Sequence, residues 1–361
     1  PNTLTSVNNL AGLYESQGHY AEAEPLYLRA LSARERVLGS EDLGTLISVN
    51  NLGSVYRSQG RYAEAEPLFL RALSARERLL GMEHPSTLTS VNNLALLYRS
   101  QGRYADAEPL YVRALSGRER VLGSEHPSTS TSVNNLALLY RSQGRYADAE
   151  PLFLRALRAS ERVLGWEHPN TLASVNNLAA LYDSQGRYAD AEPLVLRALS
   201  TYERVLGREH PHTLTSVNNL AALYKSQGRY AEAEQLYLRA LSAYQRVLGR
   251  EHPGTLSSVN NLAALYRSQG RYADAEPLLL RALSARERVL GSEHPNTLTS
   301  VNNLAGLYES QGRNADAEPL YLRALTARER VLGMEHPNTL TSVNNLAGLY
   351  ESQGHYAEAE P

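Results

Sequence analysis

The chain has 361 residues, of which 36 are Lys or Arg and 38 are Asp or Glu, so its net charge is −2. This balance argues against a protein dedicated to nucleic acid or to a membrane surface, and the absence of Cys excludes disulfides, a thiol nucleophile and a Cys-bound zinc. No apolar run approaches the length of a membrane span, and no secretion signal is visible, which favours a cytoplasmic location.

One segment of sequence recurs through the whole chain. The residues SVNNL surround Asn9 and return every 42 residues as far as Asn345, and 337–361 repeats 1–25 without a difference. A fixed period of this size predicts a solenoid, in which each unit buries its apolar face on its neighbours, and helical spacing within each unit makes the predicted fold class all-α. We expect a single solenoid over 1–361, and, because no initiator Met is present, a piece of a longer protein. Its units are 1–42, 43–84, 85–126, 127–168, 169–210, 211–252, 253–294 and 295–336, with a partial unit at 337–361.

The spacing of apolar residues within each unit predicts two helices. In the opening unit Val7, Ala11 and Tyr14 recur at helical spacing within a helix of about 2–16, and a second apolar stripe runs through about 20–38. A Gly follows each helix, as is common at helix ends.

Two features break the local pattern. Pro25 and most of its equivalents fall inside the second helix, where Pro removes a hydrogen bond, so we expect a slight bend or a later helix start. In the second unit Asp42-Leu43-Gly44 replaces the usual His-Pro turn, and we expect a looser or shifted turn there.

The unit resembles the tetratricopeptide repeat, and its 42-residue period is similar to the kinesin light chain variety of that repeat. The residues that carry the resemblance are Asn9-Leu10-Ala11, Tyr14, Gly18, Tyr20, Ala23, Tyr27 and Ala30, with Leu-Gly-x-Glu-His-Pro closing most units. The resemblance covers the whole chain. It implies a right-handed α-solenoid superhelix of antiparallel helix pairs whose first helices line a concave groove. It also implies that extended peptides or helices bind there, with asparagines holding the ligand backbone.

Two adjacent Asn stand in every first helix, although Asn is a poor residue for a helix interior because its amide competes with the backbone. One interpretation is a ladder of amides offered to a peptide backbone. The other is that one Asn of each pair bonds to the neighbouring unit, and the two roles could be divided between the Asn9 type and the Asn8 type. The candidate ligand-binding residues of this kind are Asn51, Asn93, Asn135, Asn177, Asn219 and Asn261.

Two further positions on the same face vary between units. Units two to four carry Arg where the first unit has Glu15, and units three and four carry Leu three residues earlier. This combination favours a partner segment that joins an acidic group to a bulky apolar side chain. The alternatives are complementation of the helix dipole by Arg and drift on a solvated face. The candidate residues are Leu96, Leu138, Arg57, Arg99, Arg141, Lys225 and Arg267.

Neither catalysis nor metal binding is predicted. Almost every polar residue recurs in every unit, whereas a nucleophile, a base and an oxyanion donor must meet at one place. His210 and His212 form a pair without a third ligand, so we expect no metal and no cofactor. The predicted function is a non-enzymatic scaffold that binds a protein or peptide ligand in the groove. The alternative is a structural spacer, or an array that associates with itself end to end.

Overall fold

The computed structural model describes residues 2–355, and this part of the chain forms α-helices and no strand. The first helices of the repeats are α1 (Asn2–Ser16), α3 (Leu43–Ser58), α5 (Pro85–Ser100), α7 (Pro127–Ser142), α9 (Pro169–Ser184), α11 (Pro211–Ser226), α13 (Pro253–Ser268), α15 (Pro295–Ser310) and α17 (Pro337–Gln353). The second helices are α2 (Tyr20–Leu38), α4 (Tyr62–Leu80), α6 (Tyr104–Leu122), α8 (Tyr146–Leu164), α10 (Tyr188–Leu206), α12 (Tyr230–Val247), α14 (Tyr272–Leu290) and α16 (Asn314–Leu332). The predicted all-α class and the predicted bounds of the opening helix pair are confirmed.

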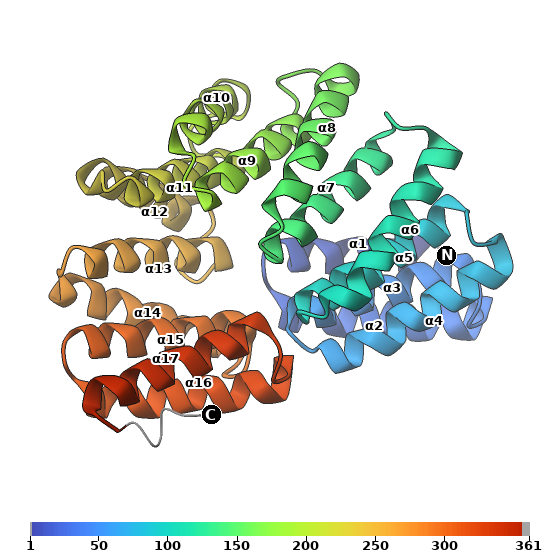
Figure 1. The fold of residues 1–361 in the computed structure, drawn as a ribbon. Coiled ribbons are helices and arrows are strands. Elements are labelled where there is room, and N and C mark those ends of the chain that lie inside the picture. The colour runs from blue at the N-terminus through green and yellow to red at the C-terminus, as the bar shows by residue number, and fades with distance from the viewer. Residues whose placement is uncertain (1, 356–361) are drawn as a thin grey trace. The chain divides into compact units, whose positions relative to one another are not determined.

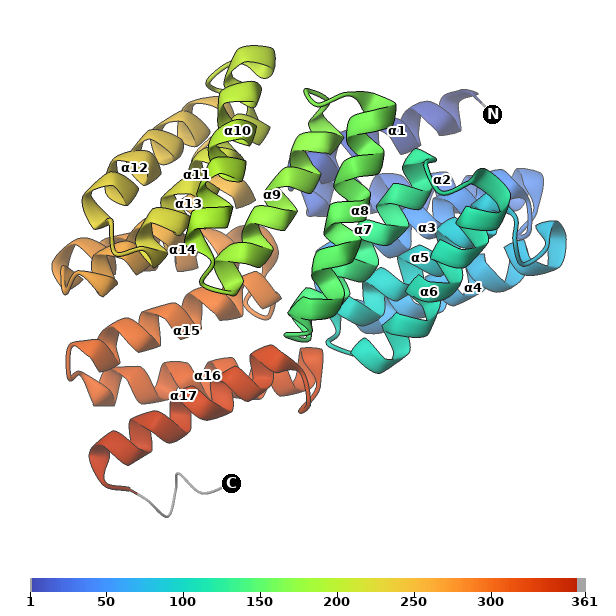
Figure 2. The same ribbon diagram turned by 45° about the horizontal axis from the view of Figure 1, so that its top comes forward.

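Residue contacts divide the chain into two compact units, which end and begin within α11, at Leu223 and Tyr224. In each unit, helices that follow one another pack side by side (Figures 1 and 2). First helices also touch the first helix of the next repeat: α5 contacts α7 in the first unit, and α15 contacts α17 in the second.

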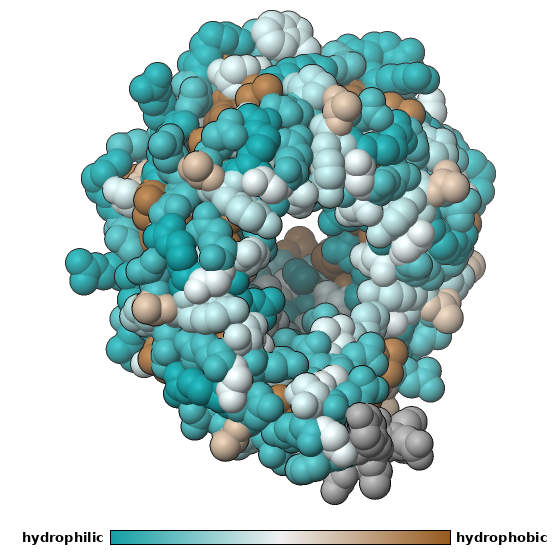
Figure 3. Space-filling model, turned by 60° about the vertical axis from the view of Figure 1, so that its left-hand side comes forward, coloured by the Kyte–Doolittle hydropathy of each residue, from teal (hydrophilic) through white to brown (hydrophobic). Residues whose placement is uncertain are grey.

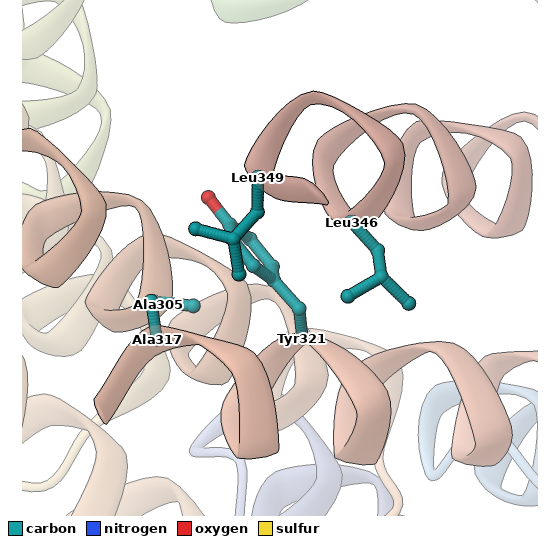
Figure 4. Close-up of a cluster of buried hydrophobic side chains, with 5 residues drawn as sticks. All are labelled: Ala305, Ala317, Tyr321, Leu346 and Leu349. Atoms are coloured by element: carbon teal, nitrogen blue, oxygen red, sulfur yellow. The ribbon is translucent and has the colours of Figure 1, made fainter. Parts of the chain in front are cut away.

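Small residues let the paired helices approach closely. Ala95 of α5 and Ala107 of α6 are fully buried, and so is Leu97, which lies outside the apolar stripe predicted for the first helix. The stripe is wider than predicted because second helices cover the first helix on two sides. The last repeats follow the same design, with Ala305, Ala317, Tyr321, Leu346 and Leu349 in one cluster (Figure 4).

The first helices begin at a side-chain cap. Nδ1 of His84 accepts a hydrogen bond from the backbone N–H of Ser86 at 3.1 Å, and the equivalent histidines do the same. In the second repeat Asp42 takes this role, because its Oδ1 accepts from the N–H groups of Gly44 at 2.8 Å and Thr45 at 3.3 Å. The looser turn predicted at Asp42 is therefore wrong, since a carboxylate caps a helix as an imidazole nitrogen does.

Proline does not delay the start of the second helices. Helix α2 begins at Tyr20 although it contains Pro25, and α12, which has Gln235 at that place, begins at the equivalent Tyr230. The later start predicted from Pro is wrong, because the turn before it keeps its other hydrogen bonds.

The second helices of successive repeats are joined by a recurring group of Arg, Tyr, Glu and Asp side chains. The guanidinium of Arg103 lies 4.0 Å from the centre of the Tyr98 ring, bonds Glu66 of the preceding repeat at 3.0 Å and bonds Asp106 of its own repeat at 2.8 Å. The Tyr98 hydroxyl donates to the same Glu66 at 3.0 Å. Equivalent arginines at 61, 145, 187, 271 and 313 repeat the stacking and the two ion pairs.

The surface is mainly hydrophilic where Figure 3 shows it, with hydrophobic residues scattered over that face. In the described part of the chain, no helix combines the length and the apolar character that crossing a bilayer requires.

Candidate functional site

Three arginines occupy the last turns of α3, α5 and α7 in the first unit. Arg57, Arg99 and Arg141 are half-buried, and their guanidinium groups make no hydrogen bond or ion pair with residues 2–355. Burial lowers the pKa of Arg57 and of Arg141, and the neighbouring positive charge of Arg99 lowers both further, while the negative charge of Glu15 opposes this effect at Arg57. We call these residues the arginine cluster. Positive groups that are partly desolvated and close together form a favourable site for an anion.

The predicted leucines lie beside this cluster. Leu96 and Leu138 are half-buried and stand three residues before Arg99 and Arg141, which places each pair on one face of its helix. Because α5 and α7 touch, these apolar and basic residues lie on neighbouring helices.

The asparagines link neighbouring repeats. Nδ2 of Asn93 donates to Oδ1 of Asn50 at 3.0 Å, and Asn135 donates to Asn92 at 2.9 Å. The same bond joins Asn51 to Asn8, Asn177 to Asn134 and Asn345 to Asn302. Each bond joins an Asn of the Asn9 type to an Asn of the Asn8 type in the preceding repeat. Both types therefore take part in stacking at these junctions, and stacking is not reserved for the Asn8 type. At these junctions the amide N–H groups stabilise the stacking of repeats.

Other junctions use a different pattern. Asn176 donates to Ser216 Oγ and Asn260 donates to Ser300 Oγ, both at 3.1 Å, and the Oδ1 atoms of the two Asn are buried without a partner among the described residues. Asn219, Asn261 and Asn303, each the second Asn of its pair, make no side-chain hydrogen bond in the described part of the chain.

In repeats whose first helix ends with Glu, a Tyr of the second helix donates a hydrogen bond to that carboxylate. The Tyr27 hydroxyl donates to Glu15 at 3.1 Å, and the Tyr321 hydroxyl donates to Glu309 at 2.6 Å. Burial raises the pKa of Glu15, while the hydrogen bond from Tyr27 lowers it.

In repeats that carry Arg at the position of Glu15, a Tyr at the position of Tyr27 would have no carboxylate to accept its hydrogen bond. The second and fourth repeats replace the Tyr by Phe69 and Phe153. The third repeat keeps Tyr111 with Arg99, and the Tyr111 hydroxyl is buried without a hydrogen-bond partner in the structure of 2–355. The residue at the Tyr27 position thus varies partly with the charge at the Glu15 position. This covariation is present in the sequence but becomes visible only when the two positions are compared across repeats.

Lys225 and Arg267 lie in the second unit. Burial lowers the pKa of Lys225, and the charge of Arg267 adds to this effect. Arg267 packs so closely on Gly306 that any side chain there would displace it. With Glu309 and Asn303 it lines a hollow of about 590 Å³.

Metal ligands do not gather in the described residues, where no three His, Asp or Glu side chains meet in a suitable group. The histidine before a first helix instead caps that helix through Nδ1, which explains why one recurs in most repeats.

Comparison with known proteins gives a consistent family match. The sequence model described as "Tetratricopeptide repeat" matches 2–78, 46–120, 86–162, 131–204, 171–246, 212–288, 254–330 and 300–361. A crystal structure from Podosopora anserina, described as nearly identical TPR-like repeats of a kinesin light chain, is 30% identical over 56% of this chain and 95% of that chain, with a TM-score of 0.49. BtubC (BKLC) from P. vanneervenii is 25% identical over 68% of this chain and 92% of that chain, with a TM-score of 0.48.

A third solved structure is similar over its full length. Rap protein complexed with competence and sporulation factor is 16% identical over 100% of both chains, with a TM-score of 0.56, a likeness that concerns the fold. Comparison with curated proteins found no match.

Proposed function

Because the chain belongs to the tetratricopeptide repeat family, we propose that it is a non-enzymatic scaffold that binds an acidic segment of a partner protein on the first helices of its second to fourth repeats. Repeats of this family generally mediate protein–protein interaction. The observation that carries the finer proposal is the arginine cluster, because three half-buried guanidinium groups lie close together and none makes a hydrogen bond or ion pair within the described chain. Within the cluster Glu15 acts electrostatically on Arg57 alone, so Arg99 and Arg141 are the main candidates for an acidic partner group.

The neighbouring residues define what else the segment should contain. Leu96 and Leu138 offer apolar surface directly beside Arg99 and Arg141, so an apolar side chain next to the acidic one would bury surface as its charge is paired. Contact with α3, α5 and α7 together requires an extended segment.

The asparagines contribute in two ways. Asn51, Asn93, Asn135 and Asn177 use their N–H groups for stacking, and they retain acceptor oxygens for a ligand backbone. Asn219 and Asn261 keep both donor and acceptor. Ala at Asn93, Asn135 or Asn177 would weaken the stacking of the repeats as well as remove an acceptor, so the test of the proposal changes the arginines instead.

The test is selection from a random-peptide library on this chain, beside a variant with Ala at Arg57, Arg99 and Arg141. We expect acidic peptides with an apolar neighbour, with affinity that falls as salt rises, and loss of that enrichment in the variant. A control that removes the same number of positive charges places Ala at three exposed arginines outside the cluster, Arg29, Arg158 and Arg208, and should keep the enrichment. The proposal fails if the same peptides are enriched on the variant of the arginine cluster.

End-to-end association remains the alternative function. The near-identity of the repeats motivates it, because any repeat can stack on a copy of its neighbour. Light scattering that shows a strict monomer at high concentration would contradict this alternative, and a mass that grows with concentration would support it.

A further inference from the structure

Most junctions between repeats contain a buried arginine. In the third repeat Nη1 of Arg118 donates to the Ser128 carbonyl at 3.0 Å and to Ser132 Oγ at 2.8 Å, and Nη2 donates to Thr89 Oγ1 at 3.2 Å. The guanidinium thereby joins the first helices of two successive repeats. The equivalent residues Arg34, Arg76, Arg286 and Arg328 are likewise buried and bond the equivalent carbonyl and Ser.

The fourth repeat lacks this arginine because two residues have exchanged places. The five repeats with the buried arginine have Ser-Ala-Arg, Ser-Gly-Arg or Thr-Ala-Arg here, and repeats five and six have Tyr202 and Tyr244 in place of the Arg, whereas the fourth has Arg158-Ala159-Ser160. Arg158 is exposed on α8 and Ser160 is buried. The guanidinium has therefore moved to the solvent side of the helix, and a hydroxymethyl group occupies its buried place.

A cavity of about 180 Å³ lies at this place, between α7, α8 and α9 of the first unit. Ser160 and Ser130 both line it, and Ser130 stands where other repeats have a buried Leu such as Leu88. Two small polar residues on facing helices have thus replaced one long cation and one large apolar side chain.

The acceptors that hold the guanidinium elsewhere remain in the wall of the cavity. They are the carbonyl of Asn170, Oγ of Ser174 and Oγ1 of Thr131, at the same sequence offsets from Ser160 as the partners of Arg118. With no guanidinium from the chain, Ser174 donates back to the Asn170 carbonyl at 3.2 Å. Glu125 also lines the cavity, and its carboxylate pairs with Arg162 at 2.7 Å.

We propose that this cavity is a binding site for a guanidinium group supplied from outside the chain. The three acceptors match the planar fork of a guanidinium. Ala159, Val163 and Leu164 supply an apolar wall for a short alkyl chain. The group comes either from a small guanidinium compound or from an arginine of a partner protein.

This site is distinct from the surface proposed for the acidic segment. None of Arg57, Arg99 and Arg141 lines the cavity, and the two ligands have opposite charge. A variant with Ala at these three arginines should therefore keep guanidinium binding, which makes failure of one proposal distinguishable from failure of the other.

The experiment measures the thermal unfolding midpoint of this chain in millimolar methylguanidinium chloride. Methylammonium chloride at the same concentration is the control, because it carries the same charge but lacks the planar set of N–H donors of a guanidinium. We expect methylguanidinium to raise the midpoint relative to methylammonium. Ser160→Arg, which restores the side chain of the other repeats, should weaken methylguanidinium binding at least about tenfold, the equivalent of about 1.4 kcal/mol.

Ser160→Tyr is the second variant, since the next repeat has the buried Tyr202 at this place. An equal response of the natural chain and of both variants would overturn the proposal, and so would an equal effect of the two salts. A capped arginine dipeptide beside its lysine counterpart separates the sources. If the arginine dipeptide binds and both variants lose it, the site accepts an arginine side chain, and if only methylguanidinium binds, it accepts a small compound.

Discussion

The Tyr111 hydroxyl is a buried polar group without a partner in the described chain, beside a first helix that carries Arg99. Leaving such a group unsatisfied opposes folding, so Tyr111→Phe should raise the free energy of unfolding at pH 7 by about 1 kcal/mol. Phe69 and Phe153 show that the fold accepts Phe at this place. Denaturant unfolding checks the prediction, and a loss of more than 1 kcal/mol on removing the hydroxyl would contradict it.

The same residue has a second consequence, at alkaline pH. Burial raises the pKa of Tyr111 to about 12, above its ordinary value of 10.0. Because the folded pKa is the higher one, the stabilisation is complete below pH 10 and is lost as pH rises toward 12. Tyr111→Phe should lose less stability than the natural chain between pH 9 and pH 11, as measured by denaturant unfolding at each pH.

Arg99→Glu provides the matching test of the pairing between charge and hydroxyl. The carboxylate would offer Tyr111 the acceptor that Glu15 offers Tyr27 and Glu309 offers Tyr321. In the Arg99→Glu background, Tyr111→Phe should therefore be destabilising, and a double-mutant cycle measures the change of sign. Equal effects in the two backgrounds would rule out the pairing.

His210 gives the opposite pH dependence. Burial lowers the pKa of His210, and the neighbouring His212 lowers it further, from an ordinary value of 6.5. The folded pKa is the lower one, so the stabilisation is present above pH 6.5 and is lost as pH falls through the folded value. His210→Asp keeps a capping acceptor, as Asp42 shows, and should lose less stability than the natural chain between pH 7 and pH 5.

At the scale of helices, the buried arginines are the main polar connection between repeats. Arg118→Ala removes hydrogen bonds to Ser132, Thr89 and a carbonyl and leaves a cavity, so it should lower the free energy of unfolding by about 2–4 kcal/mol. Arg113→Ala is the control, because its ion pair with Glu77 is partly exposed and is expected to contribute less than about 1 kcal/mol. Similar losses in the two variants, measured by denaturant unfolding, would show that the buried arginine has no special role.

The helices could be predicted from the sequence because apolar spacing and the Gly that follows each helix act locally. The polar connections could not, since each one joins residues of different repeats. Arg118 would ordinarily be assigned to the surface, and its burial follows from Ser132 and Thr89, which lie 14 residues after it and 29 before it. The cavity at Ser160 was missed for the same reason.

The candidate site was predicted in part. Arg99 and Leu96 share a helix face, which the spacing of a single helix already determines. The role of Asn93 could not be settled from the sequence, because an amide can serve a ligand or a neighbouring repeat equally well. The bond from Asn93 to Asn50 resolves how its N–H groups are used.

At the scale of the whole molecule, helices contact mainly their neighbours along the chain, so local stability should differ from junction to junction. The junction after the fourth repeat has a cavity where others have a buried arginine. Hydrogen exchange followed by mass spectrometry should therefore show faster exchange in α8 and α9 than in α6 and α7, and Ser160→Arg should reduce the difference. Equal exchange in the two helix pairs would contradict this prediction.

The exchange of Arg158 and Ser160 also has a mechanical consequence. A chain of similar repeats that is stretched from its ends carries the same tension at each junction, so the junction with the weakest connection separates first. The contact between α8 and α9 lacks the buried guanidinium, so it would open before the junction joined by Arg118. A guanidinium bound in the cavity would raise the force needed to open it, so that the ligand would adjust the elasticity of the array at one defined place.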